Sequence, residues 1–193
     1  MSIIKDGTGT GKNAQVTEKN QLSVKSESES IQHSQSFNEE QAYQVRGNTN
    51  LASAAVTVLH IENTSSTRSI VVTYIRHQVI AASGGTEFPN VSNYLAIGFG
   101  TTYDSGGSVC TPINMNNGSG HTAEVISYCG APTVTGTFTE FDRWYTKADG
   151  DMNTYNKEGS VIIQPNQTFE VRYIGDHSSG IISTRVSFIM KEN

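Results

Sequence analysis

The chain has 193 residues, of which 35% are hydrophobic, and a formal net charge of -5 at pH 7. Its 13 lysines and arginines are scattered along the sequence, so no basic stripe is present to neutralise a phosphate backbone and we expect no nucleic-acid partner. No apolar run approaches the roughly 18 to 20 residues that cross a bilayer, and the first residues lack the basic and apolar regions of a signal peptide. We therefore expect no membrane partner and synthesis in the cytoplasm.

The character of the chain changes near residue 48. Residues 1–48 are polar and rich in turn-forming types, whereas short apolar runs of β-forming residues follow almost to the end. Within the first part, residues 26–30 alternate serine and glutamate and cannot bury enough apolar area to offset an ordering entropy of about 1 to 2 kcal/mol per residue. We predict an extended N-terminal arm over residues 1–48, ordered by a partner, and one domain over residues 49–193.

The arm contains only a few sizeable apolar side chains, among them Val16, Leu22 and Val24. After it, period-two alternation and β-branched or aromatic enrichment predict about eight to nine strands, bounded by Gly, Asn, Pro and Ser clusters. The predicted strands cover residues 55–61, 69–82, 93–101, 109–115, 123–129, 133–145, 160–163, 169–173 and 182–190.

These strands predict an all-β fold. The domain has no convincing helical segment and no internal repeat, and parallel strands need crossover connections that are usually helices. The pattern therefore favours an antiparallel β-sandwich. A jelly roll is our first expectation, and an immunoglobulin-like sandwich is the second.

Two glycine-containing or acidic loops resemble ligand-binding motifs without matching them. Residues 7–12 (GTGTGK) are one residue too short for a phosphate-binding loop and no strand precedes them. Residues 149–153 place oxygen ligands at the first, third and fifth positions of a calcium loop, but Thr154 and Ser160 stand where Gly and Glu are needed. We expect an arm and a hairpin tip here, and no bound metal or cofactor. A weak calcium site shared between subunits is the alternative for the second loop.

The sequence does not indicate a catalytic site. The five histidines show no metal-ligand spacing and none lies beside a plausible nucleophile. Glu140 and Asp142 could form the acid and base of a glycosidase, but a solvated strand face near Arg143 is the preferred interpretation. We therefore expect no catalytic residues and no enzymatic activity.

The two cysteines, Cys110 and Cys129, lie on predicted strands and could face one another. Because a reducing compartment keeps thiols reduced, we expect two buried free thiols.

Aromatic residues gather between residues 138 and 145. Phe138 and Phe141 differ in parity, so they should point to opposite faces of a strand unless a bulge intervenes. An exposed aromatic ring here could stack on a sugar, but we expect it in a subunit interface, where buried aromatic residues dominate the energetics.

Four stretches carry a resemblance to a known class of proteins. Residues 6–16 (DGTGTGKNAQV), 20–24 (NQLSV) and 40–43 (EQAY) resemble the N-terminus of small virion structural proteins of tailed bacteriophages, and residues 162–171 (IIQPNQTFEV) resemble a strand-turn-strand of their β-sandwich domains. The resemblance covers the arm well and the domain only loosely.

The resemblance implies a non-enzymatic virion protein. We expect a capsid decoration (cement) protein, a homotrimer, whose arm pairs with the major capsid protein or other virion proteins. Val16, Leu22, Val24 and Tyr43 would be the apolar anchors of that arm. The alternative is a receptor- or carbohydrate-binding sandwich at a head fibre, neck or tail, and an enzyme such as a depolymerase ranks third.

Overall fold

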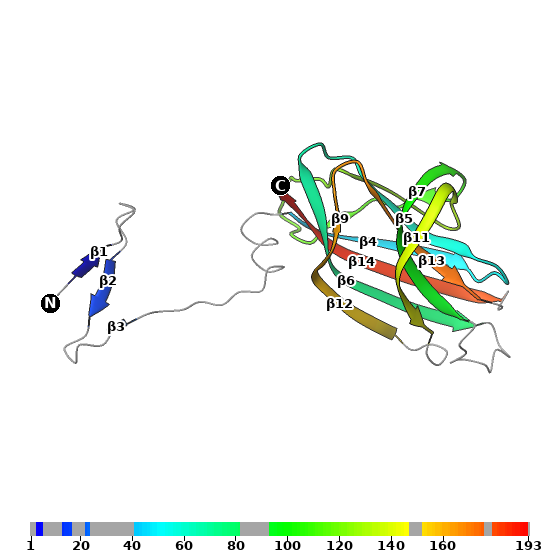
Figure 1. The fold of residues 1–193 in the computed structure, drawn as a ribbon, viewed down its shortest axis with the longest axis horizontal. Helices are drawn as coiled ribbons and strands as arrows, with labels where there is room; N and C mark the ends of the chain where they lie inside the picture. Colours follow the sequence, from blue (N-terminus) through cyan, green and yellow to red (C-terminus); the bar gives the residue numbers. More distant parts are fainter. Residues whose placement is uncertain are drawn as a thin grey trace. The chain divides into compact units, whose positions relative to one another are not determined.

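We describe residues 3–5, 13–16, 22–23, 41–81, 93–146, 152–175 and 179–192 of a computed structural model (Figure 1). Every regular element in these ranges is a β-strand, and no helix in them could span a membrane. The chain divides into two compact units, residues 1–30 and residues 31–193, and each is considered by itself.

The N-terminal unit contains three short strands. These are β1 (Ile3–Lys5), β2 (Asn13–Val16) and β3 (Leu22–Ser23), which form an antiparallel sheet in the order β1-β2-β3. Val16 of β2 is the register partner of Leu22 of β3. The third predicted anchor, Val24, lies outside the described residues.

The second unit is an antiparallel β-sandwich. Its two sheets run in the orders β11-β7-β13-β5-β10-β8 and β12-β6-β14-β4-β9. The strands are β4 (Ala42–Asn50), β5 (Val56–Asn63), β6 (Arg68–Ala81), β7 (Tyr94–Ser105), β8 (Ser108–Val109), β9 (Ile113–Asn114), β10 (Val125–Cys129), β11 (Thr133–Tyr145), β12 (Met152–Ile163), β13 (Thr168–Ile174) and β14 (Gly180–Glu192).

The pairing of the long strands is nested. The first pairs with the last, β4 with β14, and the inner pairs are β5 with β13, β6 with β12, and β7 with β11. Two further ladders, β14 with β6 and β13 with β7, join these pairs into the two sheets (Figure 1). This order is that of a jelly roll, so the predicted all-β sandwich is confirmed and the immunoglobulin-like alternative is wrong.

Alternation along each strand directs one set of side chains into the space between the sheets. On β13 and β5, for example, the partners Phe169 and Ile61 are fully buried, as are the partners Val171 and Leu59. The facing sheet contributes Val45, Ile70, Val72, Ile75, Ile182, Val186 and Phe188 to the same core. Burying these large side chains is the main favourable contribution to folding.

The domain begins earlier than residue 49, because β4 already starts at Ala42. Tyr43, predicted to be an arm anchor, is fully buried in the sandwich, where its ring stacks on Phe188 at 5.7 Å and its hydroxyl donates a hydrogen bond to Gln41 Oε1. Burial raises the pKa of this hydroxyl. Tyr43 is therefore a core residue, and the predicted boundary at residue 48 falls inside a strand.

The core-facing positions of β4 explain why the sequence concealed this strand. Tyr43 and Val45 are apolar, but the next positions on the same side are Gly47 and Thr49. A Cβ atom on Gly47 would lie 2.7 Å from the carbonyl oxygen of Val58, so the close approach of β5 excludes a larger residue. The hydrophobic alternation consequently ends after two positions.

An insertion between β7 and β11 covers one edge of the sandwich. Its strand β10 pairs with β5 in one sheet, while β9 pairs with β4 in the other. The strands that now end the two sheets at this side, β8 and β9, have two residues each, and short edge strands limit pairing with other chains. Sequence reasoning predicted one strand over residues 109–115 where the structure has the two short strands β8 and β9.

At the opposite edge, aromatic rings bridge the two sheets. Trp144 of β11 stacks on Tyr155 of β12 with ring centroids 4.1 Å apart, and Tyr155 stacks on His77 of β6 at 5.5 Å. Burial, with a smaller contribution from the charge of Asp142, raises the pKa of the Tyr155 hydroxyl. The Lys157 ammonium lies 5.0 Å from the Trp144 ring centre, so a cation–π contact caps this stack.

Truncation tests the position of the domain boundary. Removing residues 1–40 should leave a folded domain, whereas removing residues 1–48 deletes most of β4 together with Tyr43 and Val45. Loss of one large buried side chain alone costs about 3 to 5 kcal/mol, a large share of the roughly 5 to 15 kcal/mol of a typical domain. Circular dichroism and thermal melting should show a cooperative transition for the shorter deletion only. Equal stability of the two truncated proteins would contradict the boundary.

Candidate interaction face

The outer face of the five-stranded sheet carries a row of three arginines. Arg185 in the central strand β14 is the register partner of Arg46 on β4 and of Arg76 on β6. All three side chains are exposed, because their positions alternate with the buried positions of the same strands. We call the surface formed by these residues and their outward-facing neighbours the arginine face.

A hollow of about 80 Å³ lies at the row. It is lined by Arg46, Arg76, His77, Gln78, Met152, Ser183 and Arg185. Beyond it, Ile181 and Ile80 are direct cross-strand partners and are each 48% exposed, while Met152 is 64% exposed. Cationic and apolar groups are thus adjacent on this face.

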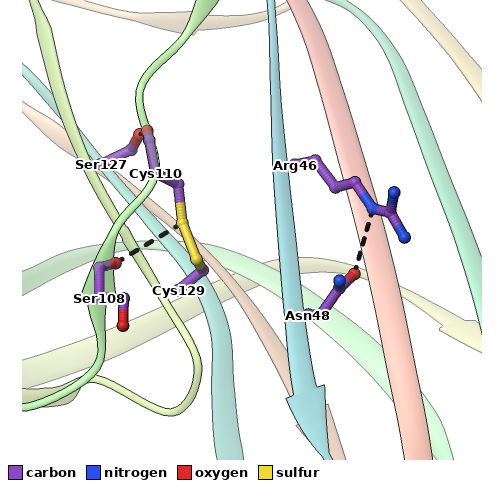
Figure 2. Close-up of a disulfide and its surroundings, with 6 residues drawn as sticks. All are labelled: Arg46, Asn48, Ser108, Cys110, Ser127 and Cys129. Carbon is purple, nitrogen blue, oxygen red and sulfur yellow. Dashed lines mark hydrogen bonds between the residues drawn. A yellow bond between two sulfur atoms is a disulfide. The ribbon is translucent and has the colours of Figure 1, made fainter.

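No carboxylate is paired with the row in the part of the chain described here. Among the described side chains of β4, β6, β12 and β14, the one carboxylate is Glu192 at the end of β14, and it pairs with Arg68 at 2.7 Å. Within the row, Arg46 Nε donates a hydrogen bond to Asn48 Oδ1 at 3.3 Å, and the Arg76 guanidinium lies 6.0 Å from the Tyr74 ring centre (Figure 2 shows the first contact). Like charges on directly opposite cross-strand positions destabilise a sheet, so the row is an unfavourable arrangement for folding alone.

Three carboxylates elsewhere in the described sandwich, Glu140, Asp142 and Glu170, contact basic side chains. Glu170 is fully buried, and its oxygens accept hydrogen bonds from Thr57 Oγ1 at 2.7 Å, from Thr101 Oγ1 at 2.8 Å and from two nitrogens of Arg172 at 2.8 and 2.9 Å. The Arg172 guanidinium also lies 4.1 Å from the centre of the Phe138 ring. With four donors on one carboxylate, this network is saturated and serves the structure of the sheet.

The predicted acid and base pair, Glu140 and Asp142, also contacts basic side chains. Glu140 accepts a hydrogen bond from Arg143 Nε, and Asp142 pairs with Lys157. The two carboxylates lie on either side of a register shift in β11, and each is paired with a basic side chain rather than with the other carboxylate. The preferred interpretation is a solvated strand face near Arg143, and the structure adds that each carboxylate contacts a basic side chain.

The two phenylalanines of β11 lie on different faces of its sheet. Phe138 covers Gly98, where an added Cβ atom would lie 2.6 Å from the ring, whereas Phe141 stacks at 4.6 Å on Phe99, the next residue of β7. Register shifts accompany both positions. Phe141 is 41% exposed and thus offers a ring edge at the surface.

Several predicted sites fall outside the described residues. These include the glycine-rich stretch of residues 7–12 and the first acidic positions of the calcium-like loop, Asp149 and Asp151. Among the residues that are described, no group of three or more His, Cys, Asp or Glu side chains could hold a metal ion.

The expectation of two free thiols is wrong. Cys110 and Cys129 form a disulfide within the insertion, with their Cα atoms 6.1 Å apart (Figure 2). The backbone amide of Cys110 donates to the carbonyl oxygen of Ser127, and the Ser127 hydroxyl donates to the carbonyl oxygen of Cys110. The β10 backbone thereby holds the two cysteines within bonding range, which their separation of 19 residues did not reveal.

Sequence reasoning also missed the arginine face. The parity of Arg76 and Arg185 within their strands was available from alternation, but the strand that holds Arg46 was not predicted, and only the register of three distant strands brings the side chains together. Comparison of the chain with protein-family models, with curated proteins and with solved structures found no match.

The stability of an Arg185→Thr variant tests the repulsion within the row. Threonine suits an exposed strand position, and the change removes both like-charge contacts, each worth roughly 0.2 to 1 kcal/mol. The melting temperature should rise by about 1 to 8 °C. Lys191→Thr, an exposed lysine further along β14, is the matched control and should change it little. An unchanged or lower melting temperature for Arg185→Thr would show that the row is not strained.

The disulfide should contribute measurably to stability. Replacing both cysteines with serine frees a loop of about 20 residues, and closing a loop of that size stabilises a fold by roughly 3 kcal/mol. Denaturant unfolding with and without a reducing agent should give a lower midpoint for the variant and for the reduced protein. A midpoint that neither treatment moves would argue against the bond.

Proposed function

We propose that this protein is a non-enzymatic structural protein of a tailed-phage virion, a decoration (cement) protein that binds the capsid shell through its N-terminal arm and associates as a homotrimer. The observation that carries the proposal is a complete jelly roll preceded by a separate unit of short strands. Viral capsid domains and lectins share the jelly-roll architecture, and fold alone does not choose between them.

The N-terminal unit supports attachment by strand pairing. Its sheet contains three short strands, and within that sheet each of the outer strands, β1 and β3, pairs on one side only. Unpaired strand edges can add to a partner's sheet, where main-chain hydrogen bonds provide affinity and a few apolar side chains select the register. Val16, Leu22 and Val24 are the apolar residues that would select it.

The chemistry of the sandwich supports a structural role. Glu170, the fully buried carboxylate, is saturated by hydrogen bonds, and the paired surface carboxylates contact basic side chains. The disulfide between Cys110 and Cys129 suits a protein that works outside a reducing compartment, as a released particle does. The protein would then be made in the host cytoplasm and oxidised later.

Deletion of the arm tests the proposal. A protein lacking residues 1–40 keeps all of β4, so it should remain folded but should no longer sediment with particles that were assembled without this protein. The full-length chain should sediment with them to a fixed, high copy number. Unchanged sedimentation of the truncated protein would rule out attachment through the arm, and the same proteins centrifuged without particles provide the control.

A carbohydrate-binding module of a head fibre, neck or tail is the second candidate. The Tyr103 and Tyr128 rings are parallel, have their centroids 3.5 Å apart and are partly exposed, and aromatic faces of this kind can stack on sugars. A glycan array with the full-length protein separates the two functions. Specific binding that is lost in a Tyr103→Ala variant, together with a low copy number per virion, would favour the module over a decoration protein.

A further inference from the structure

The arginine face is complementary to a partner that brings carboxylates and apolar side chains. Its three guanidinium groups have no carboxylate partner among the described residues, and Ile80, Ile181 and Met152 expose apolar surface beside them. Arginine and methionine are enriched in protein interfaces, and guanidinium groups bind carboxylates with two parallel hydrogen bonds. These features favour an acidic protein segment as the occupant.

The chain itself contains such a segment. Residues 26–40 (SESESIQHSQSFNEE) carry four glutamates and no lysine or arginine, and they include two large apolar residues, Ile31 and Phe37. Glu27 and Glu29 are two positions apart, so an extended backbone would direct both carboxylates to one side, about 7 Å from each other. Neighbouring arginines of the row lie on strands about 4.8 Å apart, a spacing that long side chains adjust easily.

The direction in which the chain enters the sandwich favours a second copy as the source of this segment. The amide of Met190 donates to the carbonyl oxygen of Gln41, so the ladder between β14 and β4 extends to the residue that precedes β4. The chain therefore enters β4 along the strand, heading toward Arg46. Residues 26–40 precede Gln41 in the sequence, so a second copy can present them to the face without any reversal of the chain.

We propose that the arginine face binds residues 26–40 of a second copy of this chain, and that this contact holds the oligomer together. The inference deepens the proposed function and rests on it for the oligomeric state, because it names the partner of the face and assigns the acidic part of the arm to self-association. The more N-terminal strands then remain available for the shell.

Sedimentation velocity of the full-length protein over a range of concentrations tests the proposal. In dilute salt, the wild type should associate, and raising the salt to about 0.5 M should weaken association at least tenfold, because exposed ion pairs are screened. Two variants should weaken it by at least tenfold at low salt. One replaces Arg46, Arg76 and Arg185 with threonine, and the other replaces Glu27, Glu29, Glu39 and Glu40 with glutamine.

Lys191→Thr removes a charge from another exposed position of β14 and should associate as the wild type does. Circular dichroism should show that all variants are folded, since the three arginines are exposed. A wild type that stays monomeric, or association that both variants retain, would overturn the proposal.

Mixing the two variants distinguishes a second copy from the chain's own segment. The arginine variant keeps an intact acidic segment and the glutamine variant keeps an intact face, so a mixture should regain a one-to-one complex although each is monomeric alone. No complex in the mixture would overturn the exchange between copies.

Particle sedimentation separates this inference from the proposed function. If both variants still associate while deletion of residues 1–40 abolishes particle binding, the arginine face has another role and the decoration function stands. If self-association behaves as expected while the deleted protein still binds particles, the attachment function fails and the inference about the face survives.

Discussion

The sandwich depends on the pairing of its first strand with its last. Gln44 of β4 donates a side-chain hydrogen bond to Ser187 of β14 at 3.1 Å, although the two residues are 143 positions apart. Closing a loop of that length costs about 4 kcal/mol of chain entropy by simple loop theory, and every inner pair of strands is nested within it. The core between the sheets offsets this cost only when both strands are present, which is why the start of β4 cannot be separated from the domain.

The register of this ladder also sets the surface. The pairing that buries Tyr43 against Phe188 places Arg46 opposite Arg185, and the next ladder adds Arg76. A slip of one residue would separate the arginines, but it would also expose the core side chains of β14. The repulsion in the row therefore persists because the core fixes the register, and it leaves charge available for a partner.

The two ends of the sandwich are closed by different chemistry. At the β4 and β5 side, an insertion pairs with both sheets and is closed by the disulfide of Cys110 and Cys129. At the β11 and β12 side, the rings of Trp144 and Tyr155 stack across the gap. Both sets of contacts lie at the edges of the sheets, so they leave the arginine face as an open, polar surface with an adjoining apolar patch.

Alternation predicted most strands and the β-sandwich, because period two is visible in any strand with one buried face. It failed for β4, whose core side holds Gly47 and Thr49, and for the first half of β12, whose core side holds the polar Asn153. The close approach of the β5 backbone to Gly47 explains the exception in β4. In β12, the neighbouring Tyr155 stacks on the His77 ring. The prediction of free thiols for Cys110 and Cys129 was wrong because it rested on an assumed reducing compartment, whereas the structure joins them in a disulfide.

The sequence alone determined the fold class, the polarity of the N-terminal segment and, in the strands that it predicted, the side on which most residues lie, since these follow from composition and local periodicity. Only the tertiary structure decided which strands are neighbours. Alternation specifies a face but not a partner, and hydrogen-bonded ladders join strands that are distant in sequence. The disulfide, the burial of Tyr43 and the row of Arg46, Arg185 and Arg76 all arise from those ladders.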